Sequence, residues 1–226
     1  MIEQYIMLLK LQMRVRKDCF SKTMLNLLVN QMHVVWKKRN YVIFLLLLNI
    51  IDVFDQIVSS CLVHVFHMKR ISVKLIKWVC IYIMNHITTL MLLNTKIKKS
   101  TIITEISQSS SLLSILYLFY TAKLLDICNN SNERLSTSIF VNDITLLTYE
   151  FFTEINCHML IQAHDQCLNW AHRYDISFAL KKYELIYLTY QLKRFNMWAQ
   201  LQLKNIVKES DILIHILKVW LDLKLH

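Results

Sequence analysis

The order of apolar and polar residues along the chain predicts a mixture of helices and strands. Between residues 24 and 36, apolar side chains recur at the spacing of one helix face, so this segment is predicted to be a helix. The run from Tyr41 to Leu48 is continuously apolar, β-branched and aromatic at first and then leucine-rich, and its length suits a buried strand. It is too short for a membrane span, and the polar residues Asn49, Asp52 and Asp55 follow it at once.

The rest of the pattern changes between helical and extended segments without an internal repeat or a clear domain boundary. Further helices are predicted at residues 58–69, 73–85, 116–128 and 152–174. Strands are predicted at residues 88–93, 100–104, 177–180, 184–190, 201–207 and 213–221. Residues 139–149 contain two β-prone runs around a polar pair, which indicates a hairpin with Asn142 and Asp143 at its tip. This order favours an α+β fold, a sheet with helices packed behind it.

Composition limits the class of protein and its partners. The chain has 226 residues, enough for one large domain or two small ones, and a formal net charge of +10. With a pI of about 9.3, it favours a polyanionic partner, either nucleic acid or an anionic membrane surface. Six cysteines show no paired CxxC spacing and there is no cleavable signal segment, so we expect reduced thiols in an intracellular protein, nuclear or cytoplasmic. A membrane-associated helical protein would need an apolar stretch of about 20 residues, which the sequence does not contain.

The sequence has no glycine and no proline. Average usage of about 7% and 5% would place roughly two dozen or more of them in such a chain. Selection for folding does not remove both, because turns need glycine where φ is positive and proline where φ is fixed. Transitions of C to T and of G to A in the gene do remove them, since Gly and Pro have GGN and CCN codons. Such mutational decay is our interpretation; the alternative is a designed helical protein, but designs avoid free cysteine and exposed tryptophan.

Several motifs resemble one family in the order in which that family carries them. Residues 140–143 (FVND) resemble the F-x-D-D turn of reverse transcriptases, and residues 105–116 (EISQSSSLLSIL) resemble the family's G-I-P-Q-G-S-P-L-S-P-I-L block. Every difference in that block is one that the same transitions produce. Residues 46–55 (LLLNIIDVFD) resemble the strand L-L-L-D-V-S-G-A-F-D. Residues 12–18 (QMRVRKD) and 217–222 (LKVWLD) resemble Q-M-G-A-R-K-G and L-G-V-W-L-D. Over residues 10 to 226, the chain looks most like the reverse transcriptase domain of LINE-type (non-LTR) retrotransposons of filamentous fungi.

The resemblance implies a truncated right-hand polymerase with fingers and palm. It implies a fingers remnant at residues 1–40, a palm with inserted fingers elements at 41–190, and the palm end with the start of the thumb connection at 191–226. An intact member is an RNA-directed DNA polymerase that joins a primer 3′-OH to a dNTP on an RNA template with a DNA primer. It uses two divalent cations, expected to be Mg²⁺, which carboxylate oxygens hold. No obligate protein partner is expected.

The resemblance also marks the site residues and their damage. The three metal-binding aspartates of the family fall on Asn49, Asn142 and Asp143, so that only Asp143 can still carry a negative charge to a metal ion. We therefore expect a catalytically dead fragment, in which rescue by Asp52 or Asp55 is not expected. Lys182 matches a lysine near the triphosphate, but an isolated lysine is also often a solvated charge. The nucleotide-binding positions of the family fall on Phe54, which could equally pack in the core, and Gln108.

Other patterns keep alternative interpretations open. Basic runs at residues 37–39, 96–99 and 193–194 could contact phosphates, so a non-catalytic nucleic-acid-binding remnant is the alternative function. A zinc site could be formed by Cys157, His158, His164, Cys167 and His172, but their spacing fits no standard ligand pattern. Replaced glycines should force residues with a β-carbon to positive φ, at about 1 kcal/mol or more each.

Overall fold

The structure is a computed structural model of the whole chain. It describes residues 21–38, 41–51, 58–84, 87–92, 95–101, 111–129, 133–189, 199–204, 206–217 and 219–222. The sequence-predicted positions Asp52, Phe54, Asp55 and Gln108 lie outside these residues.

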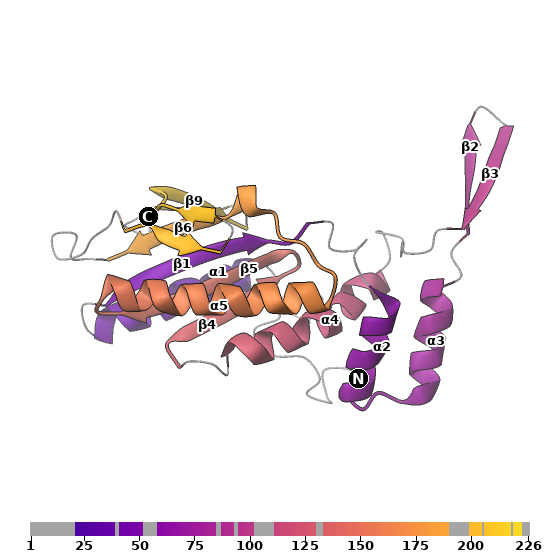
Figure 1. Cartoon of the computed structure of the whole chain (residues 1–226), viewed down its shortest axis with the longest axis horizontal. Coiled ribbons are helices and arrows are strands. Elements are labelled where there is room, and N and C mark those ends of the chain that lie inside the picture. Colours follow the sequence, from indigo (N-terminus) through magenta and orange to yellow (C-terminus); the bar gives the residue numbers. More distant parts are fainter. Residues whose placement is uncertain are drawn as a thin grey trace.

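A four-stranded antiparallel sheet forms the centre of the fold, in the order β4–β5–β1–β6. Its strands are β1 (Val42–Asn49), β4 (Leu135–Phe140), β5 (Asp143–Glu150) and β6 (Glu184–Leu188). Figure 1 shows β1 in the interior of the sheet with α5 and α4 across one face. Because β1 has sheet neighbours on both edges, the continuous apolar run predicted its position correctly.

The alternating side chains of β1 belong to two separate cores. Phe44 and Leu46 pack into the larger core, with side chains of α2 (Ser59–Met68), α4 (Ser111–Asn129) and α5 (Thr153–Arg173). Ile43 and Leu45 face the other way, toward α1 (Ser21–Lys38) and the terminal hairpin. Successive residues of a strand point to opposite faces, so a strand covered on both sides must be apolar at every position. The fold is therefore α+β, as the order of elements predicted.

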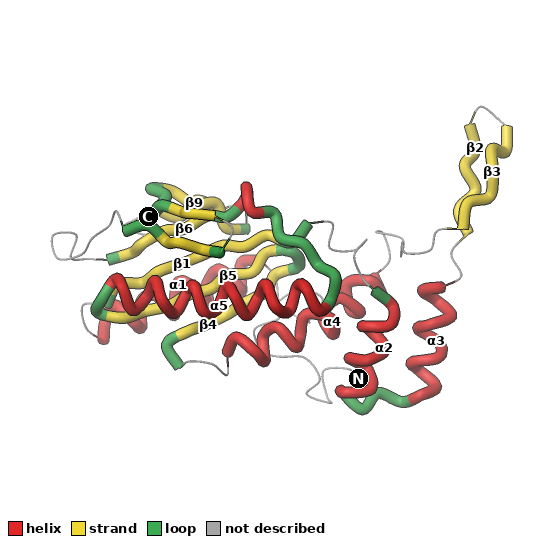
Figure 2. Tube along the Cα trace, viewed as in Figure 1, coloured by secondary structure: helices red, strands yellow, loops and turns green. Residues whose placement is uncertain are grey.

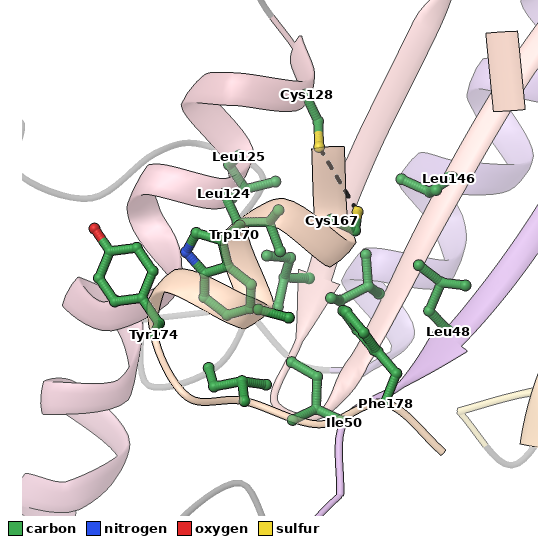
Figure 3. Close-up of a cluster of buried hydrophobic side chains, with 14 of the residues drawn as sticks. Leu48, Ile50, Leu124, Leu125, Cys128, Leu146, Cys167, Trp170, Tyr174 and Phe178 are labelled. Atoms are coloured by element: carbon green, nitrogen blue, oxygen red, sulfur yellow. Dashed lines mark hydrogen bonds between the residues drawn. The ribbon is translucent and has the colours of Figure 1, made fainter. Parts of the chain in front are cut away.

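Large aromatic side chains fill the part of the larger core between α4 and α5. Figure 3 shows Leu48, Ile50 and Leu146 of the sheet side facing Leu124 and Leu125 of α4 and Trp170 of α5. The Tyr120 hydroxyl donates to the backbone oxygen of Tyr174 at 2.6 Å. The thiols of Cys128 and Cys167 are in contact in this core, with the two Sγ atoms 3.9 Å apart.

A pair of helices and three two-stranded hairpins lie outside the central sheet, among the described residues. Beyond the end of β1, α2 is followed by α3 (Val73–Met84) and by the hairpin of β2 (Ile87–Leu92) and β3 (Thr95–Thr101). Figure 2 shows these elements projecting on one side of the molecule. The predicted helices at 24–36, 58–69, 73–85, 116–128 and 152–174 are confirmed, although α4 begins earlier, at Ser111. Strand β3 also begins earlier than expected, at Thr95.

Three predicted strands are wrong. Residues 201–207 and 213–221 each form a hairpin instead of one strand: β7 (Leu201–Leu203) with β8 (Ile206–Lys208), and β9 (Leu213–Ile216) with β10 (Val219–Asp222). No glycine or proline marks these turns, and Leu217 takes a φ of 51° in the second one. Residues 177–180 give only a bridge between Phe178 and Ile50, followed by the 3₁₀ turn η2 (Leu180–Lys182).

Among the described residues, four have a positive φ although they carry a β-carbon: Arg70 (56°), Val141 (59°), Asp175 (54°) and Leu217 (51°). Arg70 and Asp175 follow the C-caps of α2 and α5, where glycine is the preferred residue. Residues with a β-carbon thus occupy this region at these positions, as expected; that they replaced glycines stays an interpretation. Within the described parts of the chain, no helix has both the length and the apolar character needed to cross a membrane.

Candidate active site

Asn49, Asn142 and Asp143, which the resemblance marks as the metal-binding positions, lie together at one end of the sheet. Asn49 is the last residue of β1, and Asp143 is the first residue of β5; the two are direct cross-strand partners. Asn142 lies in the two-residue turn between β4 and β5, and its backbone oxygen accepts a hydrogen bond from the backbone N–H of Ile50 at 2.8 Å. Residues 94 positions apart are thus adjacent because two buried strands pair in register.

The side chains of Asn49 and Asp143 are joined by a hydrogen bond. Asn49 Nδ2 donates to Asp143 Oδ1 at 2.7 Å, and both residues are half-buried. The amide must present its NH₂ group, because its oxygen would be repelled by an ionised carboxylate. An aspartate at position 49 would instead put two carboxylates within the same distance.

Burial raises the pKa of the Asp143 carboxyl, because removing it from water penalises the charged form. The hydrogen bond from Asn49 opposes this shift of the pKa, and the electrostatic influence of the nearby Lys182 and His215 opposes it further. Asp143 therefore has one neutral donor and two nearby basic side chains.

Lys182 is positioned by η2, which is tied to the end of β1. The backbone N–H of Ala179 donates to the Asn49 oxygen at 2.8 Å, and the backbone N–H of Ile51 donates to the Ser177 oxygen at 2.9 Å. The Lys182 N–H then closes the 3₁₀ turn on the Ala179 oxygen at 2.8 Å. Lys182, proposed from the sequence as a site residue, is therefore brought to the site, although its side chain is exposed.

His215 was not a candidate in the sequence. It lies on β9, and its backbone N–H donates to Glu184 Oε2 at 2.7 Å, which ties the terminal hairpin to β6. Its ring contacts the Trp220 ring, with centroids 4.7 Å apart. Nothing in the sequence around His215 marks it as a site residue. It lies near Asp143 because the terminal hairpin docks on β6.

The turn that carries Asn142 is strained. Val141 is β-branched and has a φ of 59°, a region that such residues rarely occupy. The surrounding ladder compels this conformation, because β4 and β5 pair without a shift from Leu135 to Phe140. The strain lies directly beside the candidate site.

The described residues of this site do not fit a pair of Mg²⁺ ions. Mg²⁺ prefers several oxygen ligands, and a site for it is normally built on carboxylates. Here one carboxylate remains, and its Oδ1 already accepts the Asn49 amide. Over the described part of the chain, no three His, Cys, Asp or Glu side chains come close enough together to hold a metal ion.

The histidines and cysteines of α5 have other neighbours. His164 is buried and its Nε2 lies 3.2 Å from the Tyr183 hydroxyl, while Cys167 contacts Cys128 in the core. Burial lowers the pKa of His164, which favours the neutral ring. His158 and His172 are exposed, and Cys157 is half-buried. His164 and Cys167 therefore pack in the core, whereas His158 and His172 face solvent.

Comparison with known proteins gives a likeness of fold. No family model and no curated protein matches the sequence. Among solved structures, the fold is similar to an apo telomerase from Candida tropicalis truncated from its C-terminal domain, with a TM-score of 0.62 and 13% identity over 96% of this chain and 40% of that one. It is also similar to the telomerase of Candida albicans in complex with a TWJ fragment of telomeric RNA, with a TM-score of 0.60 and 11% identity over 90% of this chain and 33% of that one.

A third structure, telomerase from Candida tropicalis in complex with the same kind of RNA fragment, gives a TM-score of 0.56 and 12% identity over 77% of this chain and 31% of that one. The chain thus spans at most two fifths of these telomerases. Telomerase catalytic subunits are related to reverse transcriptases. The chain therefore has a truncated reverse-transcriptase-like α+β fold, as the sequence motifs predicted.

Proposed function

We propose that the chain is a reverse transcriptase domain of a non-LTR retrotransposon that has lost its polymerase activity. The observation that carries the proposal is the hydrogen bond from Asn49 Nδ2 to Asp143 Oδ1. It lies where the F-x-D-D turn and the first aspartate of the family would meet. The fold keeps the two strands that bring these positions together, but the side chains are now an amide donor and its acceptor.

Charge supports the loss of activity. An intact member of the family would have three carboxylates at positions 49, 142 and 143, whereas this chain has one. Two units of negative charge are missing. The remaining carboxyl, that of Asp143, has a pKa raised by burial and lies near the basic side chains of Lys182 and His215. Such a site attracts divalent cations poorly.

Mutational decay of the gene is supported by the helix ends. At the end of α2, Ile71 N–H donates to the Phe66 oxygen at 3.0 Å across Arg70, and at the end of α5, Ile176 N–H donates to the Ala171 oxygen at 2.8 Å across Asp175. This pattern is the capping motif that normally has glycine at the positive-φ position. A single G-to-A transition converts a glycine codon into one for arginine or aspartate.

The same proposal divides the chain into a fingers remnant at residues 1–40, a palm with inserted fingers elements at 41–190, and the palm end with the start of the thumb connection at 191–226. The ancestral partners would be an RNA template, a DNA primer and dNTP, with Mg²⁺. In that ancestor, Phe54 and Gln108 would have contacted the nucleotide.

Primer extension on an RNA template, with Mg²⁺ or Mn²⁺, tests the loss of activity. We expect no incorporation above that of an Asp143→Ala control. Incorporation clearly above the control would contradict the proposal. The Asn49→Asp/Asn142→Asp variant returns both carboxylates, but we expect it to stay at the control level because the block around Gln108 is altered as well. If this variant polymerises, the two asparagines alone account for the loss.

A second function, non-catalytic binding of nucleic acid, is favoured by the net charge of +10. The telomerases of Candida tropicalis and Candida albicans with the same fold were solved in complex with an RNA fragment. Filter binding of single-stranded RNA at increasing salt tests this function. We expect a steep fall of affinity with salt, and binding that does not change with salt, or no binding, would contradict it.

A further inference from the structure

The two sides of α3 have different chemistry. Its buried stripe consists of Ile76, Val79 and Ile83, which pack into the larger core. On the opposite side, Lys74 and Lys77 are exposed and Trp78 keeps 52% of its surface exposed. Figure 1 shows α3 as the outer helix of the α2–α3 pair, beyond the end of the sheet where β1 ends at Asn49.

An aromatic pair lies on the outer side of α3. Trp78 and Tyr82 are one helical turn apart and their rings are nearly parallel, with centroids 5.8 Å apart and planes 17° apart. The pair holds the indole ring in one orientation, and more than half of Trp78 remains open to solvent. A fixed aromatic face of this kind is what an unpaired base stacks on.

The charges around this pair have one sign. Residues 59–84 contain the basic residues Lys69, Arg70, Lys74 and Lys77 and no aspartate or glutamate. Lys69 forms an ion pair with Asp126 of α4 at 3.6 Å, which leaves Arg70, Lys74 and Lys77 as the exposed cations of the hairpin. Lys74 is one helical turn before Trp78 and neighbours its side chain, and Lys77 neighbours Lys74 three positions on. A phosphate next to a stacked base would therefore lie within reach of these lysines.

We propose that the outer side of α3, formed by Lys74, Lys77, Trp78 and Tyr82, is a contact surface for single-stranded nucleic acid. It rests on the nucleic-acid-binding function proposed above and says where on the molecule the strand lies. The rings supply stacking to any base, and the lysines neutralise phosphates, so the contact does not depend on sequence. It also does not depend on a metal ion.

A lipid surface is the competing ligand, because exposed Val73, Leu75 and Ile81 add apolar surface around the pair. A helix that binds a membrane turns its continuous apolar stripe outward. In α3, the stripe of Ile76, Val79 and Ile83 is turned inward to the core. The outer side is interrupted by lysines, which favours the nucleic acid.

The test measures the affinity of the whole chain and its variants for a fluorescent single-stranded oligonucleotide, by anisotropy across a salt series. Trp78→Leu keeps an apolar side chain without stacking, and we expect it to weaken binding about 5-fold or more; Trp78→Phe keeps a ring and should lose less. Lys74→Gln/Lys77→Gln should reduce the slope of log affinity against log salt by about 1.4. The matched control is Lys22→Gln/Lys123→Gln, which removes the same charge from exposed positions of α1 and α4.

The outcomes distinguish a failure of nucleic-acid binding itself from a wrong location of the binding surface on α3. If the natural chain binds no oligonucleotide, the nucleic-acid-binding function itself is contradicted. If it binds, but the α3 variants lose no more than the control, only the location on α3 is overturned. Co-flotation with phosphatidylserine vesicles that is lost in Lys74→Gln/Lys77→Gln, with oligonucleotide binding unchanged in the α3 variants, would assign this side of α3 to a lipid surface and overturn the proposal.

Discussion

The interior of β1 and its last residue have very different chemistry. Seven consecutive positions, 42 to 48, are apolar and buried. Their side chains pack alternately into the two cores, as in a strand covered on both faces. One residue further, Asn49 has a neutral amide where the resembled family has an aspartate. The buried apolar pattern of β1 thus ends at Asn49, the position at which the resemblance implies the chemistry.

The difference shows that folding and catalysis depend on separate residues of the same strand. Many apolar side chains share the task of burial, so a transition from one apolar residue to another leaves the core filled. A metal site depends on the charge of a few atoms, and one base change removes each charge. Under the proposed decay of the gene, the chemistry would therefore be lost before the pattern that specifies the fold.

The largest expected effect lies in the interior of β1. Leu46→Ala removes a fully buried side chain and leaves a cavity in the larger core, so the free energy of unfolding should fall by about 2–5 kcal/mol. Leu27→Ala, on the exposed side of α1, is the control and should change it by less than about 0.5 kcal/mol. Urea unfolding followed by circular dichroism measures both. Equal losses would mean that β1 is not the buried centre.

Returning the charge to the end of β1 should cost stability. Asn49→Asp replaces the hydrogen bond to Asp143 by repulsion, with an expected loss of about 1.5–3 kcal/mol at pH 7.5. The repulsion raises the shared pKa of the two carboxyls in the folded state, so the folded chain binds more protons than the unfolded one and stability falls as pH rises. The loss should therefore be smaller at pH 5.

Asn49→Ala is the control for this prediction, because it removes the hydrogen bond without adding a charge. Millimolar Mg²⁺ should raise the melting temperature of Asn49→Asp and leave that of Asn49→Ala unchanged. Thermal unfolding with Mg²⁺ or with EDTA measures this difference. Identical responses in the two variants would show that positions 49 and 143 do not interact as their 2.7 Å contact indicates.

A smaller effect is expected at the tip of the hairpin. Val141→Gly relieves a β-branched residue from a φ of 59°, and we expect a gain of about 1 kcal/mol after the larger entropy of glycine in the unfolded chain is subtracted. Val207→Gly, in the exposed strand β8, has no such strain and should destabilise the protein. If both glycine variants lose stability, Val141 is not strained in solution.

The smallest effect concerns the acid dependence of the natural chain. Burial raises the pKa of Asp143 above its ordinary value of 3.8, so the folded state holds its proton more tightly than the unfolded state. The contribution of this group to stability is then fully present below pH 3.8 and is lost as pH rises through the raised pKa. Asp143→Asn should flatten the profile of melting temperature against pH in this window. A profile that Asp143→Asn leaves unchanged would contradict the shift.

The sequence predicted the α+β class, the central strand and the five described helices, because each of these depends on local periodicity. The hairpins at 201–208 and 213–222 could not be predicted as hairpins, since their turns contain neither glycine nor proline and both arms are apolar. The resemblance to reverse transcriptases supplied Asn49, Asn142, Asp143 and Lys182 as site positions. Phe54 and Gln108 stay predictions, because they lie outside the described residues.

By itself, the sequence determined which side chains are apolar, which charges are missing from the motifs and that no glycine remains. Only the tertiary structure decided what the remaining polar groups do. Asn49 and Asp143 are 94 positions apart, and no local pattern shows that one donates to the other at 2.7 Å. His215 lies near the Asp143 carboxyl only because the terminal hairpin docks on β6. Periodicity is a property of neighbouring residues, whereas a hydrogen bond between distant strands depends on their register, which the packing of both cores sets.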